Sequence, residues 1–185
     1  PYTTLFRSNE FAAYDDRFIP SLRKLADAAK SGGALAILQL FHAGNKAVPE
    51  LIPDGELVSA SALAAPAGPF NRGEQASRAL GHDEISGVIH DFGEATRRAI
   101  EAGFDGVELH GAHGFLIQNF FSPWFNQRTD EWGGSLANRM RFPLEVVREV
   151  RRVIETHARK PFLLRYRGFV NGMVASHLLC HSGTI

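Results

Sequence analysis

The chain has 185 residues, 44% of them hydrophobic and 22% charged, which is the composition of an ordinary globular domain. Lys plus Arg and Asp plus Glu both total 20, so the formal net charge is zero and no basic excess exists to bind nucleic acid or an anionic membrane. The single cysteine, Cys180, excludes a disulfide framework and a cysteine-ligated zinc site within the chain. No apolar run reaches the ~18 residues of a membrane span, and no signal-peptide core is visible, so we expect a cytoplasmic protein without a membrane or nucleic-acid partner.

The first predicted elements are a helix, a strand and a long loop. Apolar residues recur at helical spacing from Ile19 to Ala29, and a pair of glycines ends this segment. Residues 34–40 form a short apolar run that is typical of a buried strand. Residues 42–81 are rich in proline and glycine, which predicts a long loop after the strand.

A second helix and a second strand follow this loop. The helix is predicted to start near Asp83, because Gly81 can serve as its N-cap and Glu84 stands three residues further on. Gly103 is the residue type that ends a helix. Residues 104–110, with the sequence F-D-G-V-E-L-H, then form the second predicted strand.

The last predicted elements follow another loop, which ends near Ser135. A stripe of apolar residues from Leu136 to Ile154 predicts a third helix, in which Pro143 marks either a kink or the true first turn. Residues 161–167 form the third predicted strand.

This order of elements predicts an α/β fold with a parallel sheet and covering helices. Two parallel architectures compete. A dinucleotide-binding fold requires a G-x-G-x-x-G turn between a strand and a helix, and the sequence has none. A (β/α)8 TIM barrel carries its chemistry in the loops that follow the strands, where the two longest predicted loops lie. Since such a barrel typically needs ~250 residues and eight strands, the sequence predicts a partial (β/α)8 barrel.

Polar residues lie on one face of each predicted strand, towards its carboxyl end. Strand side chains alternate between faces, which groups Glu108 with His110 in the second strand and Arg165 with Arg167 in the third. Gln39 has the equivalent place in the first strand. A barrel brings these strand ends together, so Gln39, His110 and Arg167 are predicted to converge on one ligand. Glu108, inside the face, is expected to pair with a nearby cation such as Arg165.

Each polar residue also has a purely structural interpretation. Gln39 taken alone is equally well a satisfied core amide, and Arg167 at a strand end can simply reach solvent. The two imidazoles of His110 and His113, taken alone, are most often satisfied structural histidines. They are a poor metal pair, because they do not lie at i and i+4 on a helix and no carboxylate completes a known metal spacing. A metal-dependent barrel hydrolase stays as the alternative that a metal analysis would test.

Three segments resemble the old yellow enzyme family of FMN-dependent NADH:flavin oxidoreductases and ene-reductases. They are Q-L-F-H-A-G-N (39–45), G-F-D-G-V-E-L-H-G-A-H-G-F-L (103–116) and S-P-W-F-N-Q-R-T-D-E-W-G-G-S-L-A-N-R-M-R-F-P-L (122–144). The resemblance covers roughly residues 14–167. It implies a (β/α)8 barrel with FMN at its C-terminal mouth, in which the visible strands are the third, fourth and fifth.

The resemblance also implies roles for individual residues. Gln39 matches a glutamine that hydrogen-bonds the flavin pyrimidine, and Arg167 matches an arginine near flavin N1 and O2. His110 and His113 match the catalytic pair that holds a carbonyl or nitro oxygen, and His110 also borders the cofactor. The implied activity takes hydride from NAD(P)H and passes it to small activated alkenes such as enones, to nitro compounds, quinones or oxygen. The sequence leaves open whether the intact parent forms a homo-oligomer.

Phe115 departs from the family pattern. The ene-reductases usually carry a tyrosine at this position, which protonates the substrate after hydride transfer, and phenylalanine has no proton to give. This residue shifts the expectation from alkene reduction towards general NAD(P)H oxidation with quinones, oxygen or other acceptors. The structural alternative is that Phe115 only packs and that water supplies the proton.

The domain is expected to be a single incomplete FMN-binding barrel over residues 1–185, with atypical ends at 1–8 and 168–185. The second of these segments lacks clean periodicity and ends without a helix. Without the remaining strands, both edges of the visible sheet are expected to be unpaired and prone to aggregation. We therefore expect the isolated chain to be unstable and to bind FMN weakly or not at all. A non-catalytic remnant is the alternative function.

Overall fold

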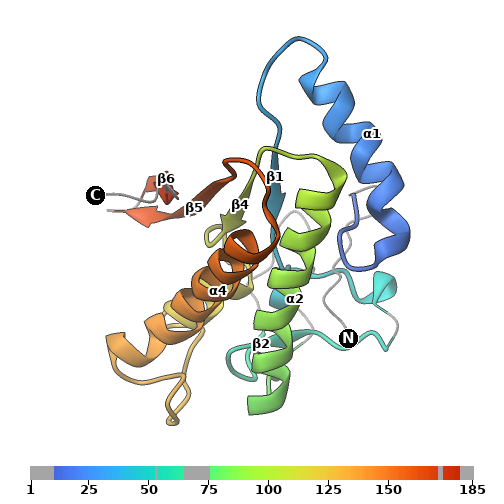
Figure 1. Cartoon of the computed structure of the whole chain (residues 1–185). Coiled ribbons are helices and arrows are strands. Elements are labelled where there is room, and N and C mark those ends of the chain that lie inside the picture. Colours follow the sequence, from blue (N-terminus) through green and yellow to red (C-terminus); the bar gives the residue numbers. More distant parts are fainter. Residues whose placement is uncertain (1–10, 53, 65–75, 171–172, 180–185) are drawn as a thin grey trace.

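The computed structural model describes residues 11–52, 54–64, 76–170 and 173–179 (Figure 1). The predicted atypical segment 1–8 lies outside these residues. The described α-helices are α1 (Ile19–Lys30), α2 (His82–Ala102), α3 (Leu116–Phe121) and α4 (Leu136–His157). The described strands are β1 (Ile37–Leu40), β2 (Val58–Ser59), β3 (Arg78–Ala79), β4 (Gly106–His110), β5 (Leu163–Val170) and β6 (Met173–Leu179). None of the helices within these residues is both long and apolar enough to cross a membrane.

The main sheet has the strand order β1-β4-β5-β6, and β1, β4 and β5 run parallel. The connection from β1 to β4 contains α2, and the connection from β4 to β5 contains α4, so neighbours in the sheet are joined by helical crossovers. The two helices pack against each other along one side of the strands (Figure 1). Successive parallel strands are thus added to the sheet in one direction, and the strand order does not reverse. A segment of a (β/α)8 barrel has this arrangement, which confirms the predicted α/β class.

The core lies between the sheet and its helices. Most side chains on the outer face of the strands are almost fully buried and meet the apolar stripes of α2 and α4. The strand residues in this core are Leu40, Val107, Leu109 and Leu164. Phe120 of α3 stacks on Phe142 of α4, with ring centroids 4.2 Å apart. This side of the sheet supplies the burial that fixes the strands, while the opposite face carries the polar residues.

The predicted helix ends are largely confirmed. Glu84 accepts a hydrogen bond from the Gly81 N–H at 2.7 Å, as expected for the start of α2, and Gly103 ends that helix in the left-handed region with φ 91°. Pro143 does not mark the first turn of α4, because Ser135 caps the helix by accepting from the Asn138 N–H. The proline lies buried inside a helix that continues on both sides.

Short elements inside the two predicted loops were missed. The first loop contains two 3-10 turns, Gly44–Lys46 and Pro49–Leu51, and the parallel pair β2 and β3. The second loop contains α3. Each is too short to produce a hydrophobic period, so their formation depends on packing rather than on local pattern.

The third predicted strand is longer than expected, and a strand that no sequence pattern indicated follows it. β5 continues to Val170, and β6 pairs with it in the antiparallel direction. The expected open edge at β5 is therefore paired, because the chain folds back and satisfies the N–H and C=O groups of that strand. β6 takes the place in the sheet where a closed barrel has its next parallel strand. Among the described strands of this sheet, β1 forms the other edge.

Candidate active site

The parallel register brings the predicted polar residues into adjacent rows. Gln39 of β1 is opposite Glu108 of β4, and Glu108 is opposite Arg165 of β5. His110 is opposite Arg167 in the next such row. Residues paired in this way point to the same face of the sheet, so the prediction that these side chains share one face is confirmed.

Glu108 is the centre of this polar cluster. Its side chain is only 6% exposed, and it accepts a hydrogen bond from Gln39 Nε2 at 2.6 Å. Arg167 Nε lies 3.0 Å from Glu108 Oε1, as an ion pair without the alignment of a hydrogen bond. Arg165 Nε lies 3.5 Å from the other carboxylate oxygen, which confirms the expected pair. Because one buried carboxylate faces two guanidinium groups, the face keeps a net positive charge.

His110 and His113 form a direct imidazole pair. His110 Nε2 and His113 Nδ1 are 3.1 Å apart, and the ring planes are inclined at 77°. His110 Nδ1 accepts a hydrogen bond from the Ala112 N–H at 3.2 Å. Burial, aided by the charges of His113 and Arg167, lowers the pKa of His110 to about 4, so this ring is neutral at pH 7. Since Nδ1 accepts, the hydrogen of the neutral ring must lie on Nε2, and it points at His113.

His113 sits in a left-handed turn. Its φ is 58°, which is uncommon for a residue with a Cβ, and Gly114 follows with φ 75°. Lys46 Nζ donates to the His113 carbonyl at 2.6 Å. The Gly114 N–H donates to Gln118 Oε1, also at 2.6 Å. Two side chains from outside the turn therefore hold the exposed imidazole of His113 against the buried imidazole of His110.

Phe115 packs under the imidazole pair. It is 8% exposed, its ring lies edge-on to His110 at 4.9 Å, and Phe41 contacts it at 5.0 Å. The packing part of the structural interpretation of Phe115 is thus confirmed. Phe41 was missed as a neighbour of the site, although strand alternation places it on the same side as Gln39 and could have identified it.

The exposed polar groups on this face fit a flavin better than a metal ion. In the part of the chain that the structure describes, no group of three or more His, Cys, Asp or Glu side chains is placed to hold a metal. Gln39 is exposed, and the side chains of Arg165 and Arg167 are 40% and 36% exposed, so none of them is a sealed core residue. An amide and two cations suit the carbonyl and ring-nitrogen acceptors of a flavin pyrimidine.

Comparison with known proteins places the chain in a family. Residues 4–174 match the model of the NADH:flavin oxidoreductase / NADH oxidase family. A probable NADH-dependent flavin oxidoreductase of Bacillus subtilis (strain 168) is 49% identical over 156 residues, which cover 84% of this chain and 40% of that protein. The NADH:fumarate oxidoreductase of Klebsiella pneumoniae (strain 342) is 47% identical over 83% of this chain and 16% of its own length.

Solved structures give the same result for the fold. Morphinone reductase in complex with tetrahydroNAD superposes with a TM-score of 0.71 and 37% identity, over 77% of this chain and 42% of that one. An old yellow enzyme homologue from Zymomonas mobilis also has a TM-score of 0.71, with 32% identity over 79% and 42% of the two chains. The chain thus spans less than half the length of these relatives. It belongs to the NADH:flavin oxidoreductase / NADH oxidase family, the old yellow enzymes, and forms a partial (β/α)8 barrel.

Proposed function

We propose that this chain carries the substrate-binding face of an FMN-dependent oxidoreductase that takes hydride from NAD(P)H. The observation that carries the proposal is the imidazole pair, with its nitrogens 3.1 Å apart, in register with Arg167 and beside the Gln39–Glu108 pair. Similar proteins are named for NADH and for NADPH, so the proposal covers either reductant.

Gln39 and Arg167 are the residues that would hold the flavin. Glu108 engages Gln39 through Nε2, which leaves the amide oxygen as an acceptor. The same carboxylate faces Arg167 through Nε, which leaves the two terminal nitrogens as donors. Glu108 therefore orients both side chains and leaves the Gln39 amide oxygen and the terminal nitrogens of Arg167 available to the flavin. Bound FMN would accept hydride from NAD(P)H and pass it to the acceptor.

The imidazole pair is suited to hold an oxygen on which negative charge develops. His110 supplies one fixed N–H from Nε2, and Phe115 limits the movement of its ring. For His113 to donate from Nδ1 to the same oxygen, that nitrogen must gain a hydrogen, by a change of tautomer or by protonation from solvent. Two fixed donors stabilise a developing oxyanion more than the neutral carbonyl. Binding of an oxygen ligand by both rings therefore requires a hydrogen on Nδ1 of His113.

Phe115 favours acceptors that need no proton from the protein, such as quinones or oxygen. Its ring carries no donor, and Tyr166 cannot replace it. The register pairs Tyr166 with Leu109, on the face of the sheet away from His110. Reduction of an enone would then depend on water for the proton at carbon.

The first experiment separates the enzyme from the alternative, a non-catalytic remnant, whose specific support is the antiparallel β6 in the place of the next barrel strand. FMN is titrated into the chain and into a chimera, in which residues 11–170 replace the matching segment of the Bacillus relative. We expect the chimera to bind FMN and its absorbance to bleach anaerobically on addition of NADH. A chimera that folds and binds FMN but is not reduced would contradict the proposal. If NADH bleaches the FMN of the chimera but the isolated chain does not bind FMN, the remnant interpretation holds only for the isolated chain.

The second experiment tests the acceptor class. The chimera is assayed with a quinone and with 2-cyclohexenone, before and after Phe115→Tyr. A positioned general acid typically contributes ~10²–10⁴-fold to a rate, so the substitution should raise enone turnover and leave quinone turnover within about twofold. Unchanged enone turnover would show that water already supplies the proton.

A further inference from the structure

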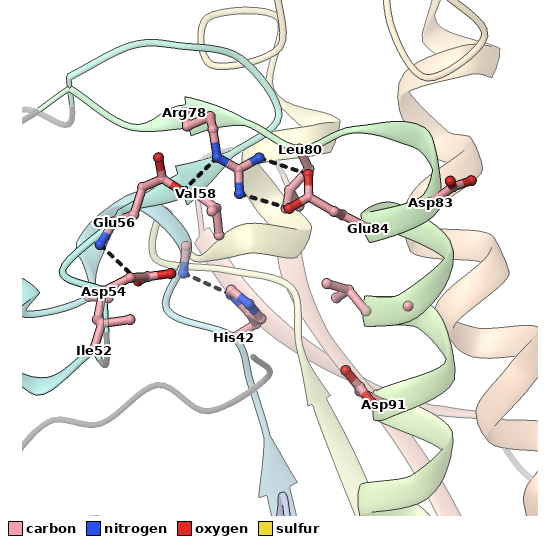
Figure 2. A pocket seen from close by; sticks show the side chains of 14 residues that line it. His42, Ile52, Asp54, Glu56, Val58, Arg78, Leu80, Asp83, Glu84 and Asp91 are labelled. Atoms are coloured by element: carbon pink, nitrogen blue, oxygen red, sulfur yellow. Dashed lines mark hydrogen bonds and ion pairs between the residues drawn. The ribbon is translucent and has the colours of Figure 1, made fainter. Parts of the chain in front are cut away.

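A cavity lies on the helix side of the sheet, and neither imidazole of the pair lines it. It is enclosed by the segment that follows β1, by β2 and β3, and by the first half of α2, and its volume is about 310 Å³ (Figure 2). Part of its wall is apolar and consists of Ala47, Ile52, Val58, Leu80 and Val88. A cavity of this size is at the lower end of the range for small-molecule sites, which are typically ~300–1,000 Å³.

His42 is an almost fully buried residue that presents an N–H group to this cavity. The residue is 3% exposed, and its Nδ1 accepts a hydrogen bond from the Gly44 N–H at 3.1 Å. Burial lowers the pKa of His42 to about 3, so the ring is neutral and its hydrogen lies on Nε2. Within the described residues, this Nε2–H has no hydrogen-bond partner. The ring is almost fully buried but borders the cavity, so a ligand in the cavity can supply the acceptor that this N–H group lacks.

The charged residues around the cavity are mainly acidic, and most of them are already engaged. Arg78 binds Glu56 through Nε at 2.8 Å and Glu84 through its terminal nitrogens at 2.7 Å. Asp54 accepts from the Glu56 N–H. Asp91 has no partner among the described residues, and it projects from α2 into the space on the side where His42 lies (Figure 2).

We propose that this cavity binds a small protonated amine that has an apolar body and a hydroxyl oxygen. Asp91 would bind the ammonium group, and the His42 Nε2–H would donate to the hydroxyl oxygen. The apolar wall would bury the body of the ligand, and removal of this surface from water favours binding. An anion of the same shape is excluded, because five lining carboxylates outnumber the one lining arginine. The site is independent of the proposed flavin chemistry.

The test uses 2-amino-1-phenylethanol as the probe, with the full 185-residue chain and with the chimera. Binding is followed by calorimetry and by the ¹⁵N–¹H signals of His42 and Gly44. We expect saturable binding of one molecule per chain and a shift of the His42 Nε2–H signal. Absence of saturable binding in both proteins overturns the proposal.

Matched ligands and variants separate the two contacts. Asp91→Asn should weaken binding about tenfold or more, the usual effect of losing a hydrogen bond to a charged group. Asp27→Asn, which removes the same charge from an exposed position on α1, should leave the affinity unchanged. Phenethylamine, which lacks the hydroxyl, should bind several-fold more weakly, and mandelate should not bind. Equal affinity for mandelate, or no effect of Asp91→Asn, would overturn the proposal without depending on any variant of His42.

Discussion

His42 and His110 lie at the carboxyl ends of neighbouring strands and share the same local hydrogen bond. In each, Nδ1 accepts from the backbone N–H two residues further on, at 3.1 Å from Gly44 and 3.2 Å from Ala112. Both side chains are almost fully buried, and both have a lowered pKa. The difference lies in what Nε2 meets. For His110 it is the imidazole of His113, and for His42 it is a cavity with an unpaired carboxylate nearby. The backbone fixes the tautomer, and the neighbours decide which chemistry the ring can perform.

The residue after each histidine also differs, for a reason that the packing shows. Ala43 follows His42, whereas Gly111 follows His110. A Cβ at position 111 would lie 2.2 Å from the Tyr166 hydroxyl oxygen. The glycine therefore lets β5 approach the end of β4 closely and keep Arg167 beside His110.

The largest expected effect is a loss of stability on acidification. The folded-state pKa values of about 3 for His42 and about 4 for His110 lie below the ordinary value of 6.5. Between pH 6.5 and 4 the unfolded chain binds more protons, so the stabilisation is complete above pH 6.5 and is lost as the pH falls. Each histidine contributes about 1.4 kcal/mol per pH unit at most. We expect the free energy of unfolding of the chimera, measured in urea, to fall by about 3–5 kcal/mol from pH 6.5 to 4.5.

The two histidines can be separated within this experiment. His42→Gln and His110→Gln should each flatten the pH dependence between pH 6.5 and 4.5, and the two changes should be of similar size in this window. Keeping the pH at or above 4.5 limits the contribution of ion-paired carboxylates such as Glu84 and Asp105. Their partners lower their pKa values, so their stabilisation is lost mainly below the ordinary values of 4.5 and 3.8. An unchanged slope in both variants would show that neither ring is buried as a neutral base.

The next largest effect is on catalysis, and it distinguishes His110 from His42. In the chimera, His110→Ala or His113→Ala should lower enone turnover by ~10²–10³-fold, the usual cost of one oxyanion donor. Both variants should also weaken the binding of phenols, measured by the change in flavin absorbance, and should slow flavin reduction by NADH less. His42→Gln is the matched control and should change phenol binding by less than about twofold. Equal phenol affinity in all three variants would remove the oxygen-binding role from the pair.

The sequence predicted the parts of the fold and site that depend on local periodicity. Alternation along the strands placed Gln39, Glu108 and His110 on one face, because a pleated strand allows no other arrangement. It did not predict that Arg167 would approach Glu108 more closely than Arg165 does, since that depends on the twist and packing of β5. The cavity at His42 was missed for a similar reason: its walls come from segments far apart in the sequence.

A smaller loss of stability is expected when Gly111 is replaced by alanine, the residue that follows His42 at position 43. Gly111→Ala should destabilise the chimera by about 1–3 kcal/mol, because the new methyl group overlaps the Tyr166 ring. Tyr166→Leu should recover part of this loss in the double variant, which a double-mutant cycle in urea would measure. Gly87→Ala, whose Cβ has no atom within 4 Å, is the control and should stabilise α2 slightly. If the losses of unfolding free energy for Gly111→Ala and Tyr166→Leu are additive, the tyrosine ring is not the reason that position 111 requires glycine.

The smallest effect on stability should come from loosening the left-handed turn at His113, which lies beside His110 and has no counterpart beside His42. Lys46 donates to the carbonyl of His113, whose φ of 58° is unfavourable for a residue with a Cβ. Lys46→Met keeps the length of the side chain but removes the donor, and since the contact is exposed we expect a loss of about 1 kcal/mol or less. The turn should then open more often, so phenol affinity should fall several-fold while the NMR signal of the His42 Nε2–H stays in place. Weaker phenol binding with a shifted His42 signal would mean that Lys46 supports both strand ends, and the local hydrogen bonds of the two histidines would no longer be independent.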